Sequence, residues 1–80
     1  MRVFKENDFV RIMQAAKGDA VEATGEYVPV PAGSTGTIVN VVGDPNRPSR
    51  YDIEFFFQER CEYVLALVDA PLVELGDAIS

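Results

Sequence analysis

Short runs in which apolar and polar residues alternate follow one another along the chain and predict β-strands. Val, Ile, Phe, Tyr and Thr dominate these runs, and glycine or proline residues separate them. These residue types favour a pleated, half-buried surface, and a period of two places alternate side chains on opposite faces of a sheet. The pattern therefore predicts strands over residues 8–14, 35–42, 50–57, 61–67 and 72–75.

The clearest alternation lies in the third of these runs, where the apolar positions are Tyr51, Ile53, Phe55 and Phe57. Residues 58–60 then predict a turn into the run at 61–67, although this turn lacks the glycine that three-residue loops prefer. In the resulting hairpin Cys61 keeps the phase of Tyr63 and Leu65, so we expect its thiol to be a small buried apolar group.

Residues 9–16 fit two kinds of element. Their apolar positions, at spacings of three and four, lie on one face of a helix, with Gly18 as its stop. As a strand, the same segment would bury Val10 and Ile12 and expose Phe9 and Met13. The periodicity favours the helix, and only the resemblance described below favours a strand through Met13.

Phe56 departs from the alternation because it falls on the polar face with Asp52 and Glu54. We expect Val64 and Ala66 to be its cross-strand neighbours, which makes an apolar patch that predicts a contact surface. A second copy of the chain is the first candidate partner, because a two-fold pair buries the same patch twice. The alternatives are that a loop over residues 15–32 covers Phe56 or that a bulge turns it inward.

A second candidate contact lies on the predicted loops over residues 19–32 and 43–50. These loops and the start of the next strand carry side chains that could recognise a peptide or simply pack the loops together: Tyr27, Arg47, Arg50 and Tyr51.

Three stretches, Asp8–Ile12, Pro31–Val39 and Tyr51–Phe55, resemble in their order the first strands of small bacterial SH3-like barrels. The order is similar to that of the nitrile hydratase beta-subunit barrel, of nitrogen-fixation accessory proteins and of short uncharacterised bacterial proteins. The resemblance spans residues 7–75 and implies a single all-β domain over residues 1–80. This domain is an SH3-like small barrel of about five strands with a long first loop.

The resemblance also implies a 3-10 turn before the last strand, in the segment that begins at Val68. The first loop is longer here than in a minimal barrel, and residues 15–19 predict a helical turn within it. The motifs are short and mostly structural, so the resemblance bears on the fold more than on the function.

Composition excludes several chemistries. The chain has no His and one Cys, which removes the usual base beside a nucleophile, an internal disulfide and a thiolate zinc cage. We interpret Asp52 and Glu54 as the polar face of a strand rather than as a glycosidase pair. Asp44 and Asn46 share a loop whose prolines leave few ligands for Ca²⁺. We therefore expect no catalytic residue, no cofactor and no metal.

The net charge of −6 argues against nucleic acid as the partner, and residues 41–80 carry eight acidic side chains against three basic ones. Charged residues interrupt the first fifteen positions and the longest apolar run is Val64–Val68, so we expect no export signal or membrane span and a reducing cytoplasm. These observations predict a non-enzymatic protein-interaction or accessory module. The alternatives are a nucleic-acid-associated barrel, an inhibitor or immunity-type partner of a basic protein, and a non-catalytic subunit that completes another chain's site.

Overall fold

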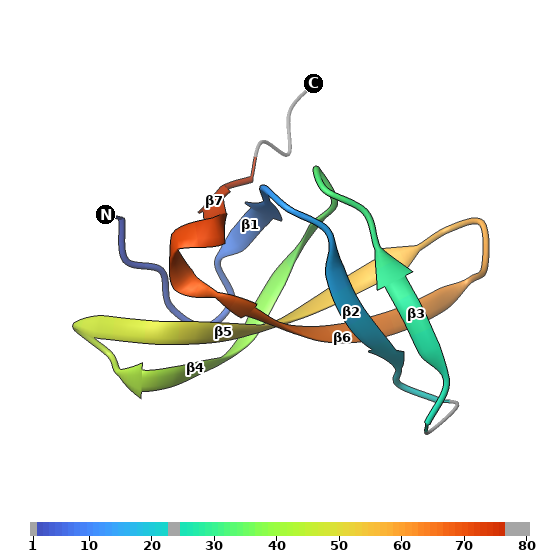
Figure 1. Ribbon diagram of the computed structural model, residues 1–80, viewed down its shortest axis with the longest axis horizontal. Coiled ribbons are helices and arrows are strands. Elements are labelled where there is room, and N and C mark those ends of the chain that lie inside the picture. The colour runs from blue at the N-terminus through green and yellow to red at the C-terminus, as the bar shows by residue number, and fades with distance from the viewer. Residues whose placement is uncertain (1, 23–24, 77–80) are drawn as a thin grey trace.

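The computed structural model describes residues 2–22 and 25–76, which form one antiparallel sheet that curls into a half-barrel (Figure 1). The strands within these residues are β1 (Phe9–Ile12), β2 (Ala16–Ala20), β3 (Tyr27–Val30), β4 (Thr35–Asp44), β5 (Arg47–Phe57), β6 (Glu62–Asp69) and β7 (Val73–Leu75). They lie in the order β3-β2-β6-β5-β4-β1-β7. The prediction of an all-β, barrel-like fold is therefore confirmed, with seven strands in place of about five.

The segment at residues 9–16 begins as a strand. β1 pairs with β4 on one side and with β7 on the other, and the side chains of Val10 and Ile12 are fully buried. Phe9 and Met13, which the helical periodicity would bury together, are exposed. Tertiary pairing on both strand edges thus outweighs the local pattern.

The predicted long first loop contains a β-hairpin made of β2 and β3, and β2 also pairs with β6. The helical turn predicted at residues 15–19 is wrong, because Ala16–Ala20 is an extended strand. Gly18 makes this possible: a Cβ at this position would meet the side chain of Val64 and lie 2.9 Å from the carbonyl oxygen of Val28. Only glycine lets the three strands approach this closely.

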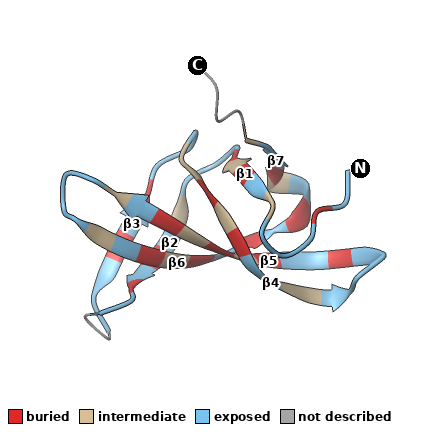
Figure 2. Ribbon diagram, turned by 180° about the vertical axis from the view of Figure 1, so that it is seen from behind, coloured by how far each residue is buried: buried red, intermediate tan, exposed pale blue. Residues whose placement is uncertain are grey.

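Buried residues line the inside of the curled sheet and alternate with exposed ones along the strands (Figure 2). The core consists of Phe4, Val10, Ile12, Ala20, Val28, Val30, Ile38, Tyr51, Ile53, Phe55, Val64, Ala66, Val68, Ala70 and Val73. Phe4 lies edge-on against Tyr51, and the backbone N–H of Phe4 donates a 3.0 Å hydrogen bond to the Tyr51 hydroxyl. The segment before β1 thus closes one side of the core.

The predicted 3-10 turn before the last strand is confirmed as η1 (Ala70–Leu72), which has Pro71 in its first turn. β4 and β5 form the longest hairpin, whose tip projects beyond the rest of the sheet (Figure 1). Register shifts between Ile38 and Asn40 and between Val42 and Gly43 interrupt this pair, and Gly43 has a positive φ of 97°. Such bulges increase the twist and bend the strand.

Candidate interaction surface on strand β6

Strand β6 is apolar on both of its faces. Val64, Ala66 and Val68 point into the core, whereas Tyr63, Leu65 and Leu67 alternate with them on the outer face. Tyr63 and Leu67 are both 49% exposed, and Leu65 is partly buried. β6 is also an interior strand of the sheet, paired with β2 and β5. We call Tyr63, Leu65 and Leu67 the β6 ridge.

An antiparallel strand with one solvated face usually alternates between apolar and polar residues, and a continuous apolar run is typical of a strand covered on both faces. The run from Tyr63 to Val68 is of the second kind. Among the residues described, the outer face of this run has no covering element, because Tyr63 and Leu67 remain about half exposed. The signal was present in the sequence as its longest apolar run.

The predicted phase of β6 was wrong. The turn between β5 and β6 contains four residues, Gln58 to Cys61, because Phe57 pairs with Glu62. Cys61 closes this turn in the left-handed region, with φ of 51°, and its side chain is exposed rather than buried. One extra residue in the turn moves every side chain of the following strand to the other face. Val64 and Ala66 are therefore core residues and not the surface neighbours of Phe56.

Phe56 itself lies on the outer face, 47% exposed, so neither a bulge nor the segment at residues 15–32 buries it. Its cross-strand partner is Tyr63, with the ring centroids 4.9 Å apart and the ring planes at 49°. The apolar surface continues past Tyr63 to Val21, whose N–H donates a 3.0 Å hydrogen bond to the Tyr63 carbonyl oxygen and whose side chain is 44% exposed. The structure thus brings Phe56 to one end of the β6 ridge.

Carboxylates flank the ridge on both sides. Leu65 lies opposite Asp19 on β2 and opposite Glu54 on β5, and Leu67 lies opposite Asp52. Asp52 is partly buried, and this desolvation raises the pKa of its carboxyl group above the ordinary value.

Positive charge is scarce around the ridge. Lys17, which shares the outer face of β2 with Asp19, is the one basic residue beside it within the described part of the chain. At the end of the same face Arg50 is neutralised by Asp69, with the Arg50 Nε 3.2 Å from the Asp69 carboxylate. The β6 ridge is therefore an apolar strip in a negative surround.

The second candidate contact does not assemble. Tyr51 is fully buried in the core, so it cannot read a peptide, and Arg50 is held by Asp69. Residues 43–50 are the ends and tip of the β4–β5 hairpin rather than a loop, and Arg47 lies at that tip. Tyr27 is exposed on β3, at the opposite end of the molecule from the hairpin tip (Figure 1). The structure therefore does not bring these four side chains together on one surface.

The edge strand β3, which lies beyond β2 from the ridge, is protected against pairing with another strand. The Ala20 N–H donates a 3.1 Å hydrogen bond to the Glu26 carbonyl oxygen, and Lys17 lies opposite Pro29 in the same ladder. Hydrogen-bonded and non-hydrogen-bonded pairs alternate in an antiparallel ladder, which places Pro29 at a non-hydrogen-bonded position. Its nitrogen, which carries no hydrogen, therefore faces the free edge, as is typical of a blocked edge.

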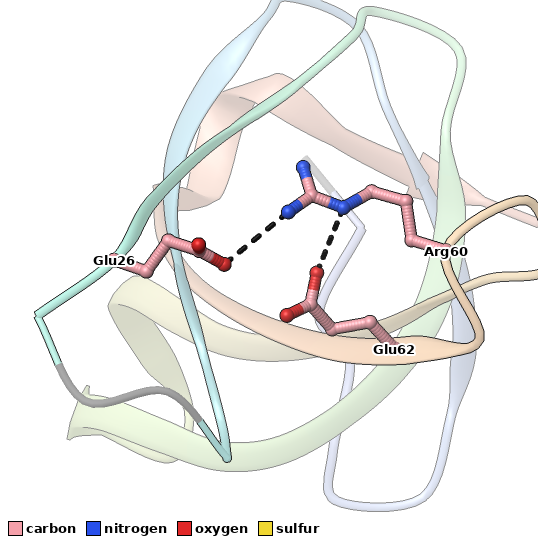
Figure 3. Close-up of polar contacts among 3 residues, drawn as sticks. All are labelled: Glu26, Arg60 and Glu62. Carbon is pink, nitrogen blue, oxygen red and sulfur yellow. Dashed lines mark hydrogen bonds and ion pairs between the residues drawn. The ribbon is translucent and has the colours of Figure 1, made fainter.

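The Arg60 side chain joins the β2–β3 hairpin to the β5–β6 turn (Figure 3). One terminal nitrogen of its guanidinium donates a 3.2 Å hydrogen bond to Glu26, at the entry to β3. The Arg60 Nε lies 2.9 Å from an oxygen of Glu62 on β6, in an ion pair whose N–H is not aligned for a hydrogen bond. The Arg60 side chain thereby holds the β2–β3 hairpin against the β5–β6 turn.

A hollow of about 600 Å³ lies between the N-terminal segment and the end of β7 and is lined by Arg2, Lys5, Asp8, Phe9 and Leu75, among others. Over residues 2–22 and 25–76, no three His, Cys, Asp or Glu side chains lie together as a metal site would need. In the same residues no helix has the length and apolar character required to cross a membrane.

Comparison of the chain with protein-family models, with curated proteins and with solved structures found no match.

Proposed function

We propose that this protein is a non-enzymatic binding module that contacts another protein through the β6 ridge, with Phe56 at one end of the contact. The observation that carries the proposal is that an interior strand of the sheet is apolar on both faces while, among residues 2–22 and 25–76, no element covers its outer face, where Tyr63 and Leu67 are about half exposed. Burying an exposed Leu or aromatic side chain is favourable by about 1.5–3 kcal/mol. A partner that covers the three half-exposed or partly buried side chains gains much of that free energy.

The charges around the ridge weigh against the other candidates. A second copy of the chain, stacked on the same face, would bring Asp19, Asp52 and Glu54 against their own counterparts with only Lys17 to offset them. Nucleic acid would meet the same carboxylates. The surface instead supports the hypothesis of a basic protein partner. The exposed thiol of Cys61 is compatible with the reducing cytoplasm that the single cysteine predicts.

Site-specific photo-crosslinking in cells of the source organism tests this function. A photoreactive phenylalanine analogue replaces Tyr63 on the ridge or, as a control, Val3, which is 46% exposed near the far edge of the sheet. We expect a discrete protein adduct from position 63 that disappears when Leu67→Lys is added, and none from position 3. Equal adducts at both positions, or none at position 63, would contradict the proposal. An adduct of twice the chain's mass would identify a second copy as the occupant.

A further inference from the structure

We infer that the β6 ridge binds an amphipathic α-helix of another protein, one whose apolar stripe is bordered on both sides by Lys or Arg. This inference rests on the proposed function and specifies the partner's chemistry. Three features of the ridge lead to it: its backbone pairing, its dimensions and its charge.

The backbone of β6 at the ridge pairs with neighbouring strands. β6 pairs with β5 along Glu62–Asp69 and with β2 along Val64–Ala66, and Tyr63 accepts a hydrogen bond from Val21, so an incoming strand finds no free ladder along Tyr63–Ala66. The nearer sheet edge, β3, carries Pro29 at an outward-facing position. The occupant must therefore satisfy its own backbone hydrogen bonds and contact the ridge through side chains alone, as a helix does.

The dimensions match a helix. Side chains on one face of a strand repeat about every 6.6–6.8 Å, so the three ridge residues span about 13 Å. A helix rising 1.5 Å per residue covers that length in about nine residues, with apolar positions at i, i+4 and i+7 or i+8. Asp19 and Glu54 lie on the two strands that flank Leu65. Strands are spaced about 4.8 Å apart, which places these two positions about 10 Å from each other, close to the diameter of a helix.

The charge selects a basic helix. Among the described residues three carboxylates and one ammonium group flank the ridge, and the Arg50–Asp69 pair adds no net charge. A cation beside Asp52 would offset the burial that already disfavours its ionised form. The exposed faces of Phe56 and Tyr63 can also accept an Arg or Lys side chain in a cation–π contact. An anionic membrane surface, the other common target for an apolar strip, would be repelled.

Fluorescence anisotropy with a labelled synthetic peptide tests the inference. The probe is an 18-residue helix with leucines in one stripe and lysines elsewhere. Two control peptides are used: one has glutamate in place of every lysine, and the other has the same composition in scrambled order. We expect the basic amphipathic peptide to bind at physiological salt, and both controls to bind at least tenfold more weakly.

A matched pair of protein variants separates the ridge from the general negative charge. The double variant Asp19→Asn with Glu54→Gln removes two of the carboxylates that flank the ridge. Glu6→Gln with Asp44→Asn removes two exposed carboxylates elsewhere. We expect the first double variant to weaken peptide binding at least tenfold and the second to weaken it less than twofold. Circular dichroism confirms that both variants remain folded.

Equal weakening by the two double variants would overturn the inference, because binding would then reflect net charge alone. Binding of the acidic or the scrambled peptide as tight as that of the probe, or no binding of the probe, would also overturn it. Binding to vesicles of an anionic phospholipid that depends on Leu67 would replace it with a membrane role. If position 63 forms a protein adduct but any of these peptide results contradicts the inference, the proposed function stands. Only the assignment of a basic helix as the partner is then wrong. If position 63 forms no adduct and the probe peptide does not bind, both the proposed function and the basic-helix inference are wrong.

Discussion

Phe56 and Tyr63 lie directly opposite each other on β5 and β6, with their ring centroids 4.9 Å apart and both side chains about half exposed. The pair joins the two strands on the outer face, while Phe55 and Val64, next to them in the chain, pair on the inner face with no exposure. The two faces of this one hairpin therefore separate a candidate binding surface from the core.

Truncation of the two faces should have different effects on stability. We expect Phe56→Ala to lower the free energy of unfolding by about 0.5–1 kcal/mol, the size of a cross-strand aromatic pair, with no loss of fold. Phe55→Ala should cost about 3–5 kcal/mol, because it leaves a cavity in the core, and in a domain this small it should unfold the protein. Circular dichroism during urea titration should show a cooperative transition for Phe56→Ala and none for Phe55→Ala, and transitions of similar midpoint for the two variants would contradict the assignment of faces.

Light scattering on a sizing column tests the oligomeric state that the charge of the ridge implies. We expect the wild type and Phe56→Glu to elute as folded monomers at two concentrations, because like carboxylates oppose self-association of this face. A wild-type dimer that the substitution converts to a monomer would show that a second copy covers the β6 ridge.

Tyr51→Phe should reveal the buried hydrogen bond that closes the core near the N-terminus. The Phe4 N–H would lose its acceptor, which lies 3.0 Å away. We expect a loss of about 1–3 kcal/mol, because the N–H stays buried without a partner. Tyr63→Phe removes the same atom from an exposed ring and should change stability by less than about 0.5 kcal/mol. Thermal unfolding of both variants, compared at one pH, provides the measurement.

Gly18→Ala should lower the free energy of unfolding, although it adds only one methyl group. The added methyl group would meet the Val64 side chain and lie 2.9 Å from the Val28 carbonyl oxygen, so β2 must move away from its neighbours. We expect a destabilisation of about 1–3 kcal/mol or more, whereas Lys17→Ala, next in the chain and exposed, should stay within about 0.5 kcal/mol. A neutral Gly18→Ala would mean that β2 does not lie closely against β3 and β6.

Substitutions of Cys61 should change the free energy of unfolding through the backbone conformation at this position. Its φ of 51° lies in the left-handed region, which costs an L-residue about 1–2 kcal/mol relative to glycine. We expect Cys61→Gly to raise the free energy of unfolding by up to about 1 kcal/mol and Cys61→Val to lower it, since β-branched residues tolerate this region least. Denaturant unfolding of the two variants decides, and a less stable Cys61→Gly would contradict the four-residue turn.

Asp52 should make a small contribution to the pH dependence of stability. Partial burial raises the pKa of its carboxyl group in the folded protein, so the folded state holds this proton more tightly than the unfolded state does. Its contribution to stability therefore falls as pH rises through the interval between the unfolded and the folded pKa. Asp52→Asn should be more stable than the wild type near pH 7, and the difference should shrink near pH 3. Urea unfolding at both pH values checks the sign, and a difference that grows in acid would contradict it.

The local sequence pattern predicted well the strands in which buried and exposed residues alternate. The alternation over residues 50–57 predicted that Tyr51, Ile53 and Phe55 point inward, and all three are fully buried. It was a poor guide to β2, because an Ala-Lys-Gly-Asp-Ala segment has little strand preference of its own and becomes a strand only by pairing with β6 and β3. The blocked edge at Pro29 likewise has meaning only once β3 is known to be the end of the sheet.

For the candidate surface, too, some features follow from the local sequence and others from the tertiary structure. The sequence by itself determined the all-β class, the acidic charge and the unusual position of Phe56, because composition and a period of two are local properties. Only the tertiary structure decided which side of β6 faces water, since that depends on whether the preceding turn has three residues or four. One left-handed residue, Cys61, supplies the fourth. It turns Val64 and Ala66 into the core and sets Tyr63 beside Phe56, because a shift of one residue exchanges the two faces of a strand.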